Sequence, residues 1–358
     1  RRVINGYAFT GTQREELLMR IAQVAPLVEA VPPRLYGGTE RVVSWLTEAL
    51  VADGHDVTLF ATGDSRTAAE LVAVRPAADR IAGAEPEAVA ALFDAVMSRI
   101  DEFDIVHFHT ETAHFLPFRG FEEKCVTTLH LRLDSEAAHA AIATNPAMPL
   151  VAISDNQRHF LPEARFVATV PHGMPDDLVA IGDGGEGHLL FVGRISPDKR
   201  PDRAIEVASR AGLPLKIAAK IDAADERYFA DEVAHLFENP IVDYLGEVDD
   251  AGKAALLAGA RALLFPIDWP EPFGLVMIEA MAAGTPVIAW RNGAVPEVIE
   301  DGVSGRIVDS IDAAAQAVAT IGEISRSGVR AAFERRFTDH RMAADYAEVY
   351  RALIDRRS

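Results

Sequence analysis

Residues 271–289 read EPFGLVMIEAMAAGTPVIA and contain, in order, a loop, a helical pattern and a short apolar strand. The helical pattern covers Leu275–Ala283, and the strand covers Val287–Ala289. Gly274 stands where the helix begins, and the first backbone N–H groups of a helix have no intrahelical partner, so they can bind an anion. A helix that leads into a buried strand is typical of α/β proteins, so this stretch predicts a parallel sheet covered by helices.

The same alternation extends in both directions along the chain. Helix-like stretches such as Thr39–Asp53, Glu87–Glu102 and Asp202–Ala211 separate short apolar runs. The runs expected to be strands are Arg20–Ala25, Asp56–Ala61, Asp104–His109, Cys125–Leu129 and Leu150–Ile153 in the first half, and His188–Val192, Leu215–Ala218, Val242–Leu245, Ala262–Pro266, Val287–Ala289 and Arg306–Val308 in the second. About eleven strands are too many for one compact doubly wound domain and suit two, which agrees with 358 residues at about 150 residues per domain.

We place the boundary between the two domains within residues 171–187, which are rich in proline and glycine. Residues 182–187 match the pattern G-x-G-x-x-G, but they precede an expected strand, whereas a dinucleotide-binding loop follows a strand and opens a helix. We therefore interpret them as a linker between an N-terminal domain, 19–172, and a C-terminal domain, 173–340.

Residues 1–18 differ from the rest of the chain because they are polar and show no period. A natural start follows at Met19, and the segment lacks the long apolar stretch and small-residue cleavage site of a secretory signal. We interpret residues 1–18 as a tag or non-native leader.

The net charge of the chain limits the classes of molecule that it can bind. The chain has 35 Lys+Arg against 54 Asp+Glu, a net charge of −19, which excludes nucleic acid as a partner and argues against an anionic membrane surface. A single cysteine, Cys125, excludes an intrachain disulfide and fits a reducing cytoplasm. No uninterrupted apolar run reaches the roughly 18 residues that an integral membrane segment needs.

Two loops at expected strand ends carry groups that bind anions. The first holds Gly37 and Gly38, whose backbone can approach an anion closely; the alternative is a flexible turn that Thr39 caps. The second carries Arg194 and Lys199 five residues apart, which would clamp a diphosphate or belong to a solvated, salt-bridged loop.

The opening stretch supplies a third loop of this kind. Glu279 lies on an otherwise apolar helix, where a buried carboxylate needs a hydroxyl or a cation as a partner, so the alternative is a structural ion pair. Glu271 lies just before the same helix. Two carboxylates, a bare helix start and an Arg/Lys loop together suit a sugar linked to a diphosphate.

Histidines gather near two strand ends. His107, His109 and Glu111 alternate, so their side chains are expected on one face, with His114 nearby. A metal site of these side chains is the weaker reading, because a strand end that lines a cleft, or core packing of His107, explains them as well. His130 ends the next strand, where a polar ring fits the lining of a site.

Together these motifs resemble the GT-B-fold glycosyltransferases of family 4, the retaining sugar-nucleotide transferases. The most specific motif is E-x7-E, formed by Glu271 and Glu279. Four further elements occur in the family's order: the turn Gly37-Gly38-Thr39-Glu40, the strand end Thr128-Leu129-His130, the loop G-R-x-S-P-x-K at 193–199, and the closing pattern Phe337-Thr338 … Met342-Ala343 … Tyr346 … Tyr350.

The resemblance implies two Rossmann-like doubly wound parallel-sheet domains that face each other across a cleft. It implies that a terminal helix at about 341–358 joins the N-terminal acceptor domain, and that the C-terminal domain binds the donor. The implied reaction moves a hexose-type sugar from a nucleotide-diphosphate sugar to an acceptor hydroxyl with retention, with no metal and no cofactor beyond that co-substrate. The implied acceptor is a small molecule, a glycan or a glycolipid.

The family's functional residues match positions of this chain. The catalytic set implied is His130, Glu271, Arg194 and Lys199. The donor-binding set implied is Gly37, Gly38, Arg194, Lys199, Val248, Phe273, Gly274, Leu275, Val276 and Glu279. The positions expected to meet the acceptor are Tyr36, His109, Glu111 and Arg132.

Two positions depart from the family's pattern. Arg200 stands where a glycine often follows the lysine, and Asn292-Gly293 replaces a common Gly-Gly pair. Two other functions are compatible with the motifs, a sugar-nucleotide 2-epimerase of the same fold and a non-catalytic sugar-nucleotide-binding protein. The intact set of charged residues argues against both.

Overall fold

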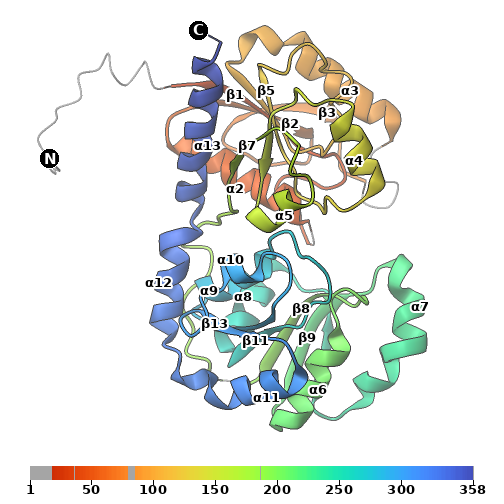
Figure 1. The fold of residues 1–358 in the computed structure, drawn as a ribbon, viewed down its shortest axis with the longest axis vertical. Coiled ribbons are helices and arrows are strands. Elements are labelled where there is room, and N and C mark those ends of the chain that lie inside the picture. Colours follow the sequence, from red (N-terminus) through yellow and green to blue (C-terminus); the bar gives the residue numbers. More distant parts are fainter. Residues whose placement is uncertain (1–17, 36, 80–84, 186, 358) are drawn as a thin grey trace, which may run out of the picture.

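The computed structural model of the protein describes residues 18–35, 37–79, 85–185 and 187–357. Two parallel sheets, each flanked by helices, lie one above the other in Figure 1. This is the two-domain α/β architecture expected from the alternation of strands and helices.

The N-terminal sheet has seven strands in the order β3-β2-β1-β4-β5-β6-β7, and neighbouring strands pair in parallel. Its strands are β1 (Arg20–Val24), β2 (Asp56–Thr62), β3 (Glu70–Arg75), β4 (Ile105–Phe108), β5 (Cys125–Thr128), β6 (Leu150–Ala152) and β7 (Phe166–Thr169). Its helices are α2 (Gly38–Ala52), α3 (Pro86–Ser98), α4 (Glu136–Ala143) and α5 (Asp155–His159), with a 3₁₀ turn at Ile100–Glu102.

The C-terminal sheet has six strands in the order β10-β9-β8-β11-β12-β13, also parallel. Its strands are β8 (Leu189–Arg194), β9 (Leu215–Lys220), β10 (Val242–Gly246), β11 (Ala262–Phe265), β12 (Val287–Trp290) and β13 (Gly305–Val308). Its helices are α6 (Pro201–Ala211), α7 (Glu226–Tyr228), α8 (Asp250–Gly259), α9 (Leu275–Ala282), α10 (Val295–Val298), α11 (Ile311–Thr320) and α12 (Arg326–Arg336). Short 3₁₀ turns lie at Ala223–Asp225, Ala234–Glu238 and Ile321–Glu323, and a π turn at Phe229–Val233.

Two strands were not expected, β3 and β7, the two edges of the N-terminal sheet. Each contains a short apolar run, LVAV in β3 and FVA in β7, but both strands are only partly buried. The number of strands predicted was therefore too small.

The chain crosses from one domain to the other twice, near residues 173–174 and again near 337–339, and the two crossing segments lie side by side. Met174 donates its N–H to Phe337 O at 2.9 Å, and Asp339 donates to Met174 O at 3.0 Å. A Cβ on Gly173 would lie 2.1 Å from Thr338 O, so this close approach requires glycine. After the second passage, α13 (Asp339–Asp355) packs along α2 of the N-terminal domain, as the dark blue helix of Figure 1 shows.

The G-x-G-x-x-G segment holds no helix over 182–185. Gly182 N donates to Ala283 O at 3.0 Å, and Gly184 N donates to Ala258 O at 3.1 Å. These two amides therefore attach the segment to the C-terminal domain.

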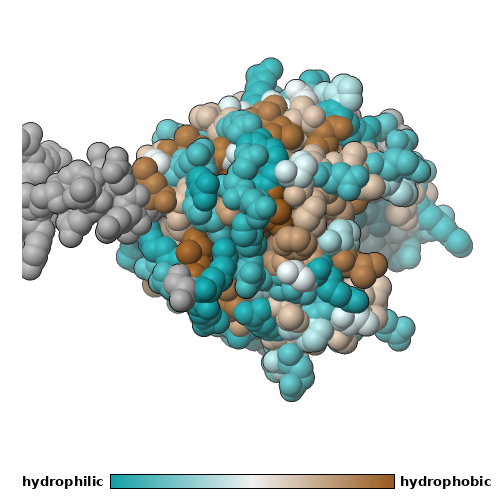
Figure 2. Space-filling view, turned by 90° about the horizontal axis from the view of Figure 1, so that it is seen from above, coloured by the Kyte–Doolittle hydropathy of each residue, from teal (hydrophilic) through white to brown (hydrophobic). Residues whose placement is uncertain are grey.

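On the face seen in Figure 2, hydrophobic residues lie interspersed with hydrophilic ones. Among the helices in the described part of the chain, none is long and apolar enough to cross a membrane.

Candidate active site in the cleft

A cavity of about 940 Å³ lies between the two domains. Its lining includes His130 just after β5, Arg194 at the end of β8, Lys220 at the end of β9 and Phe265 at the end of β11. The carboxyl ends of both sheets therefore face the same cavity, the usual position of a ligand in open parallel sheets.

The two cations predicted on the β8 loop line this cavity and differ in how firmly they are held. Arg194 Nη1 lies 3.5 Å from Asp222 and 3.8 Å from Asp225, which leaves the guanidinium free to exchange partners. Lys199 forms an ion pair with Glu271, and its Nζ lies 4.7 Å from the ring centre of Trp269. Both cations therefore lie at the wall of one cavity, Lys199 held by Glu271 and Arg194 by longer contacts.

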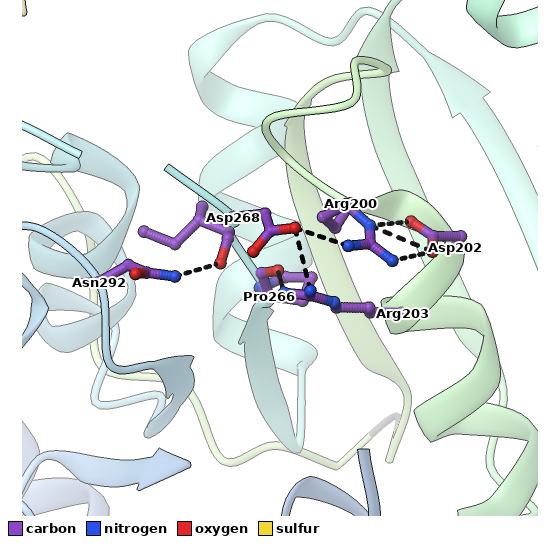
Figure 3. A network of polar contacts seen from close by, with 7 residues as sticks. Arg200, Asp202, Arg203, Pro266, Asp268 and Asn292 are labelled. Carbon is purple, nitrogen blue, oxygen red and sulfur yellow. Dashed lines mark hydrogen bonds and ion pairs between the residues drawn. The ribbon is translucent and has the colours of Figure 1, made fainter. Parts of the chain in front are cut away.

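Arg200, one of the two departures from the family's pattern, anchors the base of this loop (Figure 3). Its φ of +53° is the left-handed conformation that a glycine would adopt without strain. Its guanidinium binds Asp202 at 2.7 Å and Asp268 at 2.7 Å, and Arg203 also reaches Asp268, at 3.0 Å. These ion pairs offset the strain that the missing glycine would have avoided.

The other departure, Asn292-Gly293, supports the backbone of Glu271. Asn292 Nδ2 donates to Ile267 O at 3.0 Å, as Figure 3 shows. Gly293 has φ +55°, and a Cβ there would lie 2.3 Å from both Glu271 N and Glu271 O. Glycine is therefore required where this loop passes Glu271.

Helix α9 begins at the cavity as its sequence predicted. Gly274 is the N-cap with φ +86°, and no side chain in the described residues caps the helix. Gly274, Leu275, Val276 and Phe273 line the cavity. The free amides of the first turn therefore offer an anion site at the wall.

Both carboxylates of the E-x7-E motif line the cavity, and each is paired with a lysine. Glu271 pairs with Lys199, and Glu279 Oε1 lies 2.6 Å from Lys253 Nζ on α8. The side chain of Glu279 is 7% exposed. The structural ion pair raised as an alternative for Glu279 is thus present, inside the cavity where a ligand hydroxyl can also reach.

The N-terminal domain contributes the start of α2. Gly37 is the N-cap without a side-chain cap, so Thr39 does not cap this helix. A Cβ on Gly38 would lie 3.5 Å from the side chain of Leu275, so the starts of α2 and α9 meet across the cleft. Tyr36, expected at the acceptor, lies outside the described residues.

His130 lines the cavity, whereas His109 and Glu111 lie behind it. His109 Nδ1 is 2.8 Å from His130 Nε2, and Glu111 Oε1 accepts the His130 backbone N–H at 2.8 Å. Burial raises the pKa of Glu111 to about 7 although the amides of His130 and Leu131 oppose the rise. The two residues expected to contact the acceptor therefore support His130 instead.

His107 and His114 are core residues. His107 bonds Tyr350 and Thr128, both at 2.7 Å, and His114 bonds Thr127 at 2.8 Å while it stacks on Phe108. In the described ranges no three His, Cys, Asp or Glu side chains are placed to hold a metal ion.

Arg132, expected at the acceptor, lines the cavity beside Asp134 and lies over the ring of Trp269, 4.9 Å from its centre. Val248, expected to bind the donor, also lines the cavity. The contact between Arg132 and Trp269 joins the two domains, as does the ion pair between Arg41 of α2 and Asp250 of α8.

The cavity lining also includes residues to which the sequence motifs assigned no role of their own, among them Glu40, His172, Lys253 and Trp269. Burial raises the pKa of Glu40 to about 7, and the neighbouring Glu29 adds to the rise. His172 stacks on His130 with ring centres 5.2 Å apart. The position of His172 in the inter-domain segment was the one signal available, since that segment must pass the cleft.

Comparison with known proteins supports the motif analysis. Residues 36–183 match the family model Glycosyltransferase Family 4, and residues 182–335 match Glycosyl transferases group 1. A phosphatidyl-myo-inositol mannosyltransferase of Mycobacterium leprae (strain TN) is 28% identical over 344 residues, which cover 87% of this chain and 89% of that protein.

Solved structures share the fold. AviGT4, a glycosyltransferase involved in avilamycin A biosynthesis, superimposes with a TM-score of 0.72 at 24% identity and covers 94% of this chain and 98% of its own. Anabaena HepE in complex with UDP-glucose has a TM-score of 0.72 at 18% identity, with 93% and 100% coverage. With two parallel-sheet domains and these matches, the chain belongs to the GT-B-fold glycosyltransferases of family 4.

Proposed function

We propose that the cleft transfers a hexose-type sugar from a nucleotide-diphosphate sugar to an acceptor hydroxyl, with retention of configuration and without a metal. One observation carries the proposal: two cations, two helix starts and two carboxylates meet on one cavity. The mannosyltransferase relative and the UDP-glucose complex of a neighbour support a hexose on a nucleoside diphosphate.

The diphosphate would bind Arg194, Lys199 and the amides at the start of α9. Arg194 has only long contacts to its carboxylate partners, so a phosphate oxygen can replace them. Lys199 would turn from Glu271 towards phosphate, which frees Glu271 for a hydroxyl of the donor sugar. Preorganised positive potential of this kind stabilises the leaving diphosphate.

The ribose would bind Glu279, and the base would lie against the backbone at Val248. Lys253 already pairs with Glu279, so the buried carboxylate has a cationic partner, and its oxygens can accept hydrogen bonds from two ribose hydroxyls.

Retention follows if the acceptor attacks from the face that the diphosphate leaves. The bond from the anomeric carbon to phosphate breaks, the bond to the acceptor oxygen forms, and a phosphate oxygen takes the acceptor's proton. Closing the domains over the donor would exclude water and protect it from hydrolysis.

The acceptor would enter on the N-terminal wall near Arg132 and Glu40. Arg132 is engaged by Asp134, and Arg41 by Asp250, so this wall offers carboxylates beside satisfied cations. Such a wall suits the hydroxyls of a polyol, whether small molecule, glycan or glycolipid. The single cysteine, Cys125, is buried and unpaired, which supports the cytoplasmic location we propose.

A thermal-shift panel of UDP-, GDP- and ADP-sugars tests the donor site, because a ligand at one hundred times its Kd adds about 2.7 kcal/mol to the free energy of unfolding. Turnover of the stabilising donor with polyol acceptors, with and without EDTA, then tests transfer, and NMR of the product gives its anomeric configuration. An inverted product or loss of activity in EDTA would contradict the proposal. An epimerised sugar nucleotide formed without acceptor would show the epimerase, and binding without any turnover the non-catalytic module.

A further inference from the structure

A continuous line of hydrogen-bonded side chains runs from the cavity wall to α13. It begins at His130 Nε2, 2.8 Å from His109 Nδ1. His109 Nε2 lies 2.8 Å from Oε1 of Gln23 on β1, and Gln23 Nε2 donates to the Tyr350 hydroxyl at 3.1 Å. Each of the four side chains is at least nine-tenths buried, so each depends on its protein partners.

The line continues beyond Tyr350, away from the cavity. The Tyr350 hydroxyl lies 2.7 Å from His107 Nδ1, and His107 Nε2 lies 2.7 Å from Thr128 Oγ1. Thr128 in turn bonds the Tyr346 hydroxyl at 2.7 Å. Tyr346 therefore lies on the same helix as Tyr350 but three bonds further from His130.

The orientation of the Gln23 amide fixes the direction of the hydrogen bonds. Its oxygen can only accept, so the proton between Gln23 and His109 sits on His109 Nε2. A neutral imidazole carries one N–H, so His109 Nδ1 accepts, and His130 Nε2 donates to it. The remaining nitrogen of His130, Nδ1, then carries no proton and presents a lone pair.

Two further observations concern this nitrogen. Burial lowers the pKa of His130 to about 3, so the ring is neutral at physiological pH. Its Nδ1 is buried and has no hydrogen-bond partner in the described part of the chain. An unsatisfied buried acceptor on a cavity-lining residue is costly unless a ligand supplies the donor.

We propose that Gln23 and Tyr350 are positioning residues for glycosyl transfer, which hold His130 as the Nε2–H tautomer and leave its Nδ1 lone pair for a hydroxyl of the donor sugar. This inference rests on the proposed function. A neutral ring also places no positive charge beside a sugar that becomes cationic as the donor bond breaks. Helix α13 thus acts on the reacting sugar through Tyr350, Gln23 and His109.

Nitrogen NMR of the full chain, labelled with ¹⁵N-histidine, tests the tautomer without any substrate. His130 is assigned by the signals lost in His130→Gln. We expect the Nε2–H pattern in the wild type and a mixture of both tautomers in Tyr350→Phe, because Gln23 then has no partner that fixes its orientation. Gln23→Met, which removes the amide at similar size, should do the same. Tyr346→Phe, equally buried on the same helix, is the matched control and should keep the wild-type pattern.

Kinetics test the consequence. We expect Tyr350→Phe and Gln23→Met each to lower kcat by about tenfold, the loss of one ordinary hydrogen bond in the transition state, with donor KM nearly unchanged. The double variant should lose no more than either single variant, because both act through one path. An Nδ1–H tautomer in the wild type, or a Tyr350→Phe protein that matches Tyr346→Phe in both readouts, would overturn the inference. A wild type with the expected tautomer but no transfer from any sugar nucleotide would overturn the proposed function and, with it, the role in transfer.

Discussion

Lys253 on α8 holds Glu279 on α9, with Nζ 2.6 Å from Oε1. The same ammonium lies 3.5 Å from Asp250, which in turn pairs with Arg41 of the N-terminal domain. A line of alternating charges therefore connects the wall proposed to bind ribose with the opposite domain. A ligand proposed to bind Glu279 would therefore act on the pairing of the domains through Lys253.

Lys253→Met should weaken both stability and nucleotide binding. It leaves Glu279 buried without its cation, so we expect a loss of about 2 kcal/mol in the free energy of unfolding and about tenfold weaker binding of the nucleoside diphosphate. Chemical denaturation and calorimetric titration measure the two effects. Lys124→Met, in the other domain, is the control, and equal nucleotide affinity in both variants would refute the role of Lys253.

Arg194→Ala should lower kcat/KM by about 100-fold, because a charge-assisted contact to the leaving diphosphate is lost. Its own ion pairs are long, so the melting temperature should change little. Steady-state kinetics and a thermal melt check both statements. Arg210→Ala removes a surface arginine that pairs with Glu206 and Asp312, and it should change neither quantity. Wild-type kinetics in Arg194→Ala would contradict the diphosphate site.

Glu40→Gln should stabilise the protein more at high pH than at low pH. Burial raises the pKa of Glu40 from 4.5 to about 7, so between these values the folded state binds more protons than the unfolded state. Stability therefore falls as pH rises through this window. We expect Glu40→Gln to gain about 1 kcal/mol more over wild type at pH 8 than at pH 6. Denaturant titrations at the two pH values measure the difference, with Glu87→Gln on the exposed start of α3 as control; equal gains for Glu40→Gln would refute the prediction.

Acid should unfold the protein because its core holds neutral histidines. Burial lowers the pKa of His107, His109, His114, His130 and His172. The unfolded state takes up their protons below pH 6.5 while the folded state does not, so stability falls with falling pH by about 1.4 kcal/mol per pH unit for each ring. As the pH falls, this loss of stability from the histidines exceeds the stability gained by protonation of Glu40.

Circular dichroism and proton uptake across pH 7.5 to about 4.5 would show the transition, since the combined loss over that range reaches the total stability of a typical domain. His139→Gln, on an exposed part of α4, should leave the slope unchanged. An unfolding free energy that stays level across this range would contradict the neutral core.

Gly293→Ala should disturb Glu271 from outside the cavity. The new Cβ would lie 2.3 Å from two backbone atoms of Glu271, so we expect a loss of at least ~2 kcal/mol in stability together with lower kcat/KM. Gly120→Ala isolates the backbone strain, because φ is +94° there and nothing lies within 4 Å of the added Cβ. Equal effects of the two variants in denaturation and turnover would show that contact with Glu271 does not matter.

The fold was predictable from the sequence where a strand is buried on both faces of its sheet. Interior strands such as β11 and β12 are continuous apolar runs that are buried along their whole length. Edge strands β3 and β7 also contain short apolar runs, but they are half-exposed, and neither was predicted. The predicted number of strands was therefore too small at the two edges of the N-terminal sheet, whereas the predicted arrangement in two parallel sheets was confirmed.

The site was predictable where one local segment supplies the chemistry, as with Arg194 and Lys199 on one loop or Gly274 at one helix start. It was not predictable where the partner is remote. The pairing of Glu279 with Lys253 joins two helices, and alternation along β4 cannot say that His109 turns inward to His130. Depth and long-range pairing are properties of the packed chain, which spacing alone does not encode.

The second passage between the domains makes the C-terminal domain an insertion into the N-terminal one. Tyr346 and Tyr350 complete the first core, yet they leave the ribosome after all of β8–β13. At 5–20 residues per second, synthesis of the roughly 180 residues between β7 and these tyrosines takes on the order of 10–40 s. During that interval Gln23 and His107 have no tyrosine to bind, so the domain made first is the one finished last.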